Sequence, residues 1–263
     1  ILIILSVTAE AGNLLRMSVH PYLAAPEVIS RFSPLIEYLE EQLGCEISLE
    51  ISRDYREHIE KIGRDQVDIA YLEPASYVKT TSLFGAKKIL ARLVTSGNST
   101  FQGTIVVNRD APFTNLGDLK GKRFAFGDPN SAMSHLLPRY MLLQAGITLK
   151  DLAAAAFVNS HQNVALGVLM GHFDAGALED EVFDDYRTEG LRALVKTPSV
   201  PEHLFVGRSG LDGQTTAALQ RALLNLEDTP GGMAILTAVN KKATGLSSAS
   251  EGDYNRLQSI LQQ

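Results

Sequence analysis

Short apolar runs alternate with helical patterns along this chain, and that alternation constrains its fold more than any other feature. Residues 47–51 alternate as a strand, residues 55–62 repeat apolar side chains at helical spacing up to Gly63, and residues 67–71 form a strand again. Successive parallel strands need a crossover of this kind. The pattern therefore predicts an α/β protein with mainly parallel sheet.

A second strand-to-helix stretch runs from Lys122 to Tyr140. Its strand, residues 124–126, breaks at Gly127-Asp128-Pro129, and a helix is expected to begin near Asn130 or Ser131. Unpaired N–H groups and the positive end of a helix dipole meet at such a start, which suits an anion. An ordinary N-cap is the alternative. Pro138 either kinks this helix or marks where its regular part begins.

Other signals extend the α/β pattern on both sides of this stretch. Ser33-Pro34 predicts an N-cap and first helical residue, and residues 156–159 predict a strand. Residues 104–108 and 203–207 predict strands that cross between two units, and everything after residue 207 is expected to be helical. We expect two α/β units, the second inserted into the first.

Composition limits the classes of partner. The chain has 263 residues, is 45% hydrophobic and 21% charged, and carries a net charge of −6, which argues against nucleic acid or an anionic membrane. Its single cysteine, Cys45, excludes an internal disulfide and is expected to pack. Residues 1–12 combine an apolar run with Ala9-Glu10-Ala11, which predicts a signal-peptide remnant and hence export; a first strand is the alternative.

Several phrases of the chain resemble those of one known family. They are DIAYLEPASYV from Asp68, IVVNRDAP from Ile105, NLGDLKGKRFAFGDPNSAMSHLLP from Asn115 and NSHQNVALGVLMGHFDAGAL from Asn159. In order and spacing they resemble the phosphate/phosphite/phosphonate-type solute-binding proteins of ABC transporters. The resemblance implies a type II periplasmic-binding fold, in which two crossover strands join two α/β lobes. Lobe one would comprise residues 13–105 and 204–263, and lobe two residues 106–203.

The resemblance also implies an anion site in lobe two. Family members typically have Ser-Thr-Ser after Asp-Pro-Asn, whereas this chain has Ser131, Ala132 and Met133, followed by Ser134. A hydrogen bond to a charged group contributes about 1.5–3 kcal/mol, so the missing hydroxyls matter unless Ser134 or backbone amides replace them. Met133 is expected either to form an apolar wall or to pack in the core. His161 matches the family's histidine and can donate to an oxyanion.

Further candidates lie at strand ends that would face the cleft. Tyr71 could stack on the ligand or hydrogen-bond to it, and Glu73 would either favour an amine or only cap the helix that starts at Pro74. The remaining candidates are Phe101 and Gln102 before the first crossing, Glu179 and Asp180 after residues 174–178, and His20 after the first strand. Glu179 and Asp180 could bind an ammonium group or begin a solvated helix.

The leading hypothesis is an exported, non-enzymatic protein that captures a small oxyanion or zwitterion for the membrane subunits of an ABC importer. No catalytic residue, cofactor or metal is assigned, because the chain has no phosphate-binding P-loop or G-x-S-x-G and its histidines form no close ligand pair. Two rivals keep the fold: the sensor domain of a membrane kinase or chemoreceptor, and an enzyme that uses Glu73, His161 or Asp180 as acid or base.

Overall fold

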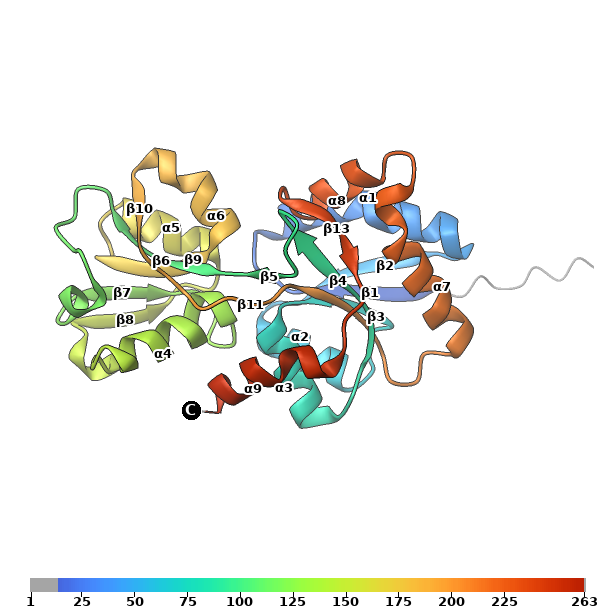
Figure 1. Ribbon diagram of the computed structural model, residues 1–263, viewed down its shortest axis with the longest axis horizontal. Coiled ribbons are helices and arrows are strands. Elements are labelled where there is room, and N and C mark those ends of the chain that lie inside the picture. Colours follow the sequence, from blue (N-terminus) through green and yellow to red (C-terminus); the bar gives the residue numbers. More distant parts are fainter. Residues whose placement is uncertain (1–13, 263) are drawn as a thin grey trace, which may run out of the picture.

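The computed structural model describes residues 14–262, which form two α/β units side by side (Figure 1). Each unit has its own central sheet with helices on both faces, as the type II periplasmic-binding fold requires. We call the unit around the six-stranded sheet lobe one and the unit around the five-stranded sheet lobe two. The predicted fold class is confirmed. The predicted signal-peptide remnant lies outside the described residues.

The sheet of lobe one combines parallel and antiparallel strands. In spatial order its strands are β13 (Ala243–Ser247), β4 (Lys88–Thr95), β12 (Leu204–Gly207), β3 (Ile69–Leu72), β1 (Leu15–Val19) and β2 (Ile47–Ile51). Strand β1 pairs in parallel with β2 and β3, whereas β12 is antiparallel to β3 and β4. The expectation of a mainly parallel sheet is therefore wrong, because β12 enters the sheet from lobe two in the opposite direction.

The sheet of lobe two is also mixed. Its strands, in spatial order, are β10 (Leu191–Lys196), β6 (Gly103–Asn108), β9 (Ala175–Glu179), β7 (Arg123–Phe126) and β8 (Ala154–Phe157). Strand β7 is parallel to β8 and β9, and β6 is antiparallel to β9 and β10. The strand predicted over residues 156–159 is shifted, because His161 and the turn before it already begin the next helix.

Helices cover both faces of each sheet (Figure 1). Those of lobe one are α1 (Ala25–Leu43), α2 (Tyr55–Gly63), α3 (Pro74–Phe84), α7 (Gly213–Leu224), α8 (Gly232–Val239) and α9 (Asn255–Leu261). Those of lobe two are α4 (Leu137–Gln144), α5 (His161–Leu169) and α6 (Asp180–Tyr186). A π-helical turn, Ala132–Leu136, precedes α4, and short 3-10 turns span Leu116–Leu119, Leu149–Asp151, Arg187–Glu189, Leu226–Asp228 and Glu251–Tyr254.

Two short strands carry the chain between the lobes. They are β5 (Thr100–Phe101) and β11 (Val200–Pro201), which pair with each other in antiparallel fashion (Figure 1). The strands predicted to cross instead belong to β6 in lobe two and β12 in lobe one. The sheets show which elements belong together, but the residue limits predicted for the two domains stay a prediction.

Helix α1 begins earlier than the sequence predicted. It starts at Ala25 with Pro26 in its first turn, and Pro34 lies inside it. The Ser33 hydroxyl donates back to the Ile29 carbonyl at 2.8 Å, so Ser33 does not cap a helix that follows it. Buried Phe32 and Leu39, on either side of the proline, pack in the same core, and this packing outweighs the single helical hydrogen bond that a proline removes.

Strand β13 was not predicted, since the end of the chain was expected to be helical throughout. Residues 243–247, Ala-Thr-Gly-Leu-Ser, have weak strand propensity, and Gly245 lowers it further. The strand forms because β4 offers an open edge, with which Ala243 and Leu246 pair. Tertiary pairing thus overrides local preference.

A hydrophobic cluster at the crossing joins the lobes. Ala132, Met133 and Leu137 of lobe two pack there with Phe101 of β5 and Val200 of β11. The start of the helix after β7 is consequently anchored next to the connection between the lobes.

Candidate ligand-binding site

Ser131 holds the start of the helix after β7. Its Oγ accepts a hydrogen bond from the Ser134 N–H at 3.3 Å, which makes it the N-cap of the π-helical turn. Regular helix begins at Leu137 with Pro138 in its first turn, so the second of the two alternatives for Pro138 is confirmed. Ser131 is 2% exposed and also shares a side-chain hydrogen bond with Tyr55 of lobe one.

Glu73 connects this turn to lobe one. Its Oε1 accepts hydrogen bonds from the N–H and the hydroxyl of Ser76, at 2.9 and 3.2 Å, and so caps α3. Its Oε2 accepts the Ala132 N–H across the interface at 3.0 Å. The side chain therefore both caps a helix and faces lobe two, which the sequence left as alternatives. Burial raises the pKa of Glu73 to about 7, against the hydrogen bond from Ala132.

His161 begins α5, as predicted, and is 3% exposed. Its Nδ1 accepts the Glu179 N–H at 3.0 Å, so the neutral ring carries its proton on Nε2. Burial and the nearby charge of His203 lower the pKa of His161 to about 3. A neutral His161 is consequently a hydrogen-bond donor through Nε2, as the resemblance implies for an oxyanion contact.

Stacked rings gather at the carboxyl ends of β1 and β3. The rings of Tyr71 and His203 lie 5.3 Å apart with 9° between their planes, and His20 stacks on His203 at 5.2 Å. We call this the aromatic cluster; its members are His20, Tyr22, Tyr55, Tyr71, Phe101 and His203. It brings together the predicted residues Tyr71, Phe101 and His20.

Carboxylates surround the one charged ring of this cluster. His203 Nδ1 lies 2.9 Å from Glu202 Oε2, with both side chains buried. Burial opposes the charge, but Glu179, Glu202 and Glu73 raise the pKa of His203 to about 9. Burial raises the pKa of Glu179 to about 8. The centre is therefore richer in acidic groups than in cationic ones.

Gln102 and Asp180 form hydrogen bonds with residues next to the connection between the lobes. Gln102 Nε2 donates to the Thr197 carbonyl at 2.6 Å, and Asp180 accepts hydrogen bonds from Lys196 Nζ, at 2.5 Å, and from the Thr104 hydroxyl. A cavity of about 340 Å³ beside them is also lined by Phe101, Glu179 and Glu202. The structure thus brings Gln102, Glu179 and Asp180 together at one opening of the interface.

The side chains of Met133 and Ser134 are both buried, and Met133 packs in the hydrophobic core. Met133 Sδ accepts a weak hydrogen bond from the Thr197 hydroxyl at 3.5 Å, and its side chain packs against Gly103. The Ser134 hydroxyl is buried against Gly127 and has no hydrogen-bond partner within residues 14–262. Neither side chain is placed to supply the missing hydroxyl donors, and the backbone N–H of Ala132 already donates to Glu73.

Contacts between the lobes surround the site. Glu181 of α6 is 6% exposed and accepts hydrogen bonds from Arg31 Nη1 at 2.8 Å and Asn240 Nδ2 at 3.0 Å, both in lobe one. On the opposite side, Asp128 Oδ2 accepts the Tyr55 N–H at 3.4 Å. These contacts hold the lobes against each other.

Sequence reasoning missed several residues of the site. His203 was assigned only to a returning strand, and Glu202, Tyr22 and Glu181 were not considered. The signal for His203 was its position immediately before β12, where the chain returns to lobe one. Arg31 carried no signal, because the helix around it was predicted to start later.

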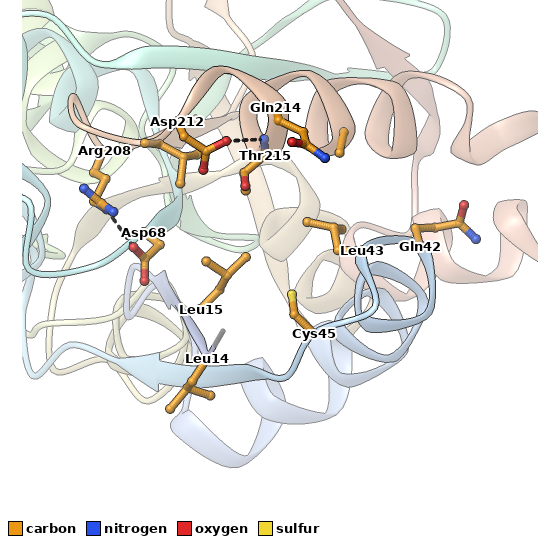
Figure 2. A pocket seen from close by; sticks show the side chains of 12 residues that line it. Leu14, Leu15, Gln42, Leu43, Cys45, Asp68, Arg208, Asp212, Gln214 and Thr215 are labelled. Carbon is orange, nitrogen blue, oxygen red and sulfur yellow. Dashed lines mark hydrogen bonds and ion pairs between the residues drawn. The ribbon is translucent and has the colours of Figure 1, made fainter. Parts of the chain in front are cut away.

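A larger pocket, of about 700 Å³, lies at the other end of lobe one (Figure 2). It is bordered by Leu15, Cys45 and Asp68, which stand at the amino-terminal ends of β1, β2 and β3, whereas α/β sheets bind ligands at the carboxyl ends. Its Asp68 pairs with Arg208 at 2.7 Å, and Asp212 caps α7. Asp68, Arg208 and Asp212 are thus engaged in holding the fold.

Within residues 14–262, no three histidine, cysteine, aspartate or glutamate side chains are arranged to hold a metal ion. No helix in the same range is long and apolar enough to cross a bilayer. Two α/β lobes closing on a buried site, with a helix start on one side and an aromatic cluster on the other, define a two-lobed solute-binding protein.

The chain belongs to the family described as ABC transporter, phosphonate, periplasmic substrate-binding protein, which it matches over residues 17–254. Members of this family bind small ligands outside the cytoplasm and work with the membrane subunits of ABC importers. The predicted family is confirmed.

Relatives of the chain differ in the ligand that their names give. It is 26% identical over 218 residues to the phosphonates-binding periplasmic protein of Escherichia coli, covering 78% of this chain and 64% of that protein. It is 26% identical to the phosphate-import protein PhnD of Mycolicibacterium smegmatis, covering 78% and 70%. The structure of Prochlorococcus marinus PhnD1 in complex with methylphosphonate superposes with a TM-score of 0.86, at 25% identity, over 94% of this chain and 96% of that one.

Proposed function

We propose that this chain is the exported solute-binding component of an ABC importer and that it closes on a small phosphonate-like ligand. The observation that carries the proposal is that the Ser131 hydroxyl, at the helix start, and the Nε2–H donor of His161 are both buried where the lobes meet. Donors of this kind suit an oxyanion. The names of the relatives support the same ligand class.

The charges around the site favour a ligand that also carries an ammonium group. Glu73, Glu179 and Glu202 are buried around His203, and Arg31 is already paired with Glu181 and Glu27. The pKa values of Glu73 and Glu179, about 7 and 8, leave these carboxyls partly ionised at neutral pH, and a simple dianion would be repelled by the charge that remains. A zwitterion brings compensating positive charge, and an aromatic face attracts an alkylammonium.

We propose binding without turnover, and transport in preference to sensing. Two of the three residues considered as acid or base are already engaged within the protein: Glu73 accepts hydrogen bonds on both oxygens, and Asp180 pairs with Lys196. The partners are the membrane subunits of the importer, with no nucleic acid. Membership of a transporter family favours this role over a sensor domain.

Isothermal calorimetry tests the proposal with phosphate, phosphite, methylphosphonate, 2-aminoethylphosphonate and amino acids. We expect 2-aminoethylphosphonate to bind more tightly than methylphosphonate, and Ser131→Ala and His161→Ala to weaken both. Exposed His172 gives a matched control, since His172→Ala should bind as the wild type does. Absence of binding to every phosphorus oxyanion would overturn the assignment. Mass spectrometry of the co-purifying solute, recovered unchanged, distinguishes binding from turnover.

A further inference from the structure

His20 has one ring nitrogen engaged with the backbone of a neighbouring strand. It follows β1, its N–H donates to the Tyr71 carbonyl at 3.4 Å, and its Nδ1 lies 3.3 Å from the same oxygen. A carbonyl oxygen only accepts hydrogen bonds, so this contact is a hydrogen bond when Nδ1 carries the proton, and the geometry favours that tautomer. The neutral ring then has a bare lone pair on Nε2.

The Nε2 atom of His20 is buried and has no hydrogen-bond partner among the described residues. The whole residue is 0% exposed. Burial and the charge of His203 hold the pKa of His20 well below its usual value, so the second nitrogen stays unprotonated. A buried acceptor left unpaired costs about 1–3 kcal/mol, which a donor from outside the protein could recover.

Two other buried histidines, His58 and His161, do not share this arrangement. His58 is equally buried, but its Nδ1 lies 3.0 Å from the Ser18 hydroxyl and its Nε2 lies 3.2 Å from the Tyr71 carbonyl. Both of its nitrogens are thus satisfied within lobe one. His161 has the opposite tautomer to His20, since its Nδ1 accepts the Glu179 N–H.

The position of His20 connects this acceptor with the site. Stacked rings of Tyr22, at 4.7 Å, and His203, at 5.2 Å, lie beside it in the aromatic cluster. His161 of lobe two is close enough to influence its charge. Because Nδ1 faces the backbone of β3, the opposite edge of the ring, with Nε2, is directed away from that strand.

We propose that His20 is a specificity-determining residue whose Nε2 accepts a hydrogen bond from an N–H or O–H donor on the carbon part of the ligand. The oxyanion of the same ligand accepts a hydrogen bond from the Nε2–H of His161. The two histidines therefore bind opposite ends of the ligand, His20 as a hydrogen-bond acceptor and His161 as a donor. This inference rests on the proposed function and adds a requirement to it: the ligand must bring a donor in addition to its phosphonate group.

Three ligands of similar size test this requirement by calorimetry: 2-aminoethylphosphonate, 2-hydroxyethylphosphonate and propylphosphonate. They place an ammonium, a hydroxyl and a methyl group at the same position. We expect wild-type protein to prefer the ammonium ligand to the propyl ligand by about ten- to a hundredfold, and the hydroxyl ligand by about three- to tenfold. In His20→Phe, which keeps a ring but has no acceptor, both preferences should shrink at least threefold.

His135 provides a matched control. Its Nδ1 also faces a carbonyl, that of Pro129 at 2.7 Å, and its Nε2 is also buried with no partner in the described part of the chain. Its ring, however, lies against Phe126 and Phe157 of lobe two, outside the aromatic cluster. Because His135 belongs to the turn at the helix start, His135→Phe is expected to change the affinity for all three ligands alike and to leave the preference between them unchanged.

Nuclear magnetic resonance of the ¹⁵N-histidine-labelled wild-type protein provides a second readout that needs no folded variant. We expect His20 to be protonated on Nδ1 and its Nε2 resonance to move when 2-aminoethylphosphonate binds. A proton on Nε2, or an unmoved resonance, would overturn the role of His20. Binding with the same ligand preference in His20→Phe overturns that role alone, whereas failure of all three ligands to bind overturns the proposed function with it.

Discussion

The carboxylate of Glu73, at the start of α3 in lobe one, accepts a hydrogen bond at 3.0 Å from the backbone N–H of Ala132 in lobe two. That N–H belongs to the helix start at which the sequence predicts an anion. The protein thus places its own negative charge beside the site, where Ala132 and Met133 replace hydroxyl residues typical of the family.

Replacing Glu73 by glutamine should strengthen binding of simple oxyanions. Loss of one nearby negative charge is expected to raise the affinity for methylphosphonate about tenfold, measured by calorimetry. The exposed Glu60→Gln variant should show no change. Equal or weaker binding by Glu73→Gln would mean that Glu73 does not oppose the ligand.

The same charge predicts a pH dependence of binding. The pKa of Glu73 is raised to about 7, so the side chain gains its charge as the pH rises through that value. Affinity for methylphosphonate should therefore fall between pH 6 and 8 more steeply in the wild type than in Glu73→Gln, by up to about tenfold. The ligand's own ionisation is common to both proteins, and parallel profiles would contradict the prediction.

Glu181→Gln should weaken the closed arrangement of the lobes. Arg31 would lose a buried ionic partner at 2.8 Å, although it keeps Glu27. A loss of about 1.4 kcal/mol in closure corresponds to about tenfold faster ligand release, measured by stopped-flow fluorescence. The exposed pair Arg56–Glu60 offers the control, since Arg56→Ala should leave release unchanged. Unaltered release by Glu181→Gln would exclude this ion pair from closure.

Buried neutral histidines should make the protein less stable in acid. The pKa values of His58 and His161 are lowered to about 3 by burial, whereas in the unfolded chain they are near 6.5. The unfolded state therefore binds more protons between these values, and stability falls as the pH drops from about 6.5 towards 3. Each histidine contributes a slope of up to about 1.4 kcal/mol per pH unit.

Urea unfolding between pH 4 and 7 measures this slope, and His58→Gln should remove one histidine's share. The comparison between the two proteins is needed because Glu73 and Glu179 have raised pKa values and act with the opposite sign. Exposed His172 is the control, and His172→Gln should keep the wild-type slope. Identical slopes for wild type and His58→Gln would show that His58 does not remain neutral when folded.

Gly127→Ala should destabilise the turn before the helix start. An added Cβ would lie 2.3 Å from the Ser134 hydroxyl oxygen, whereas one added at Gly213 meets no atom within 4 Å. We expect a loss of about 1–3 kcal/mol for Gly127→Ala by urea unfolding and little change for Gly213→Ala. Adding Ser134→Gly should recover part of the loss, and a failure to do so would place the strain elsewhere.

Local chemistry was enough to predict the elements that carry the helix start. Gly-Asp-Pro ends β7, Ser131 caps the turn and Glu73-Pro74 begins α3, each through groups close together in the sequence. The elements that failed depend on distant partners. Pro34 lies within α1 because both halves of that helix pack on one core, and β13 forms because β4 has an open edge.

The candidate site was predicted in part for the same reason. Its family motifs placed Ser131 and His161, and strand ends placed Tyr71 and His20. The charge on His203 could not be predicted, because it depends on the distant residues Glu179 and Glu73 in addition to the adjacent Glu202. Glu73 also faces the other lobe in addition to capping α3, and this second role depends on Ala132, 59 residues away.

The two ends of lobe two meet at a single place. Gln102 Nε2 donates to the Thr197 carbonyl, and the Gly103 N–H donates to the Thr197 hydroxyl at 2.8 Å. A gene segment bounded by these neighbouring points encodes lobe two, and it could be exchanged with the corresponding segment of a relative without a new linker. Such recombination would transfer Ser131 and His161 while leaving His20 and Tyr71 in place, so the halves of the recognition surface can evolve separately.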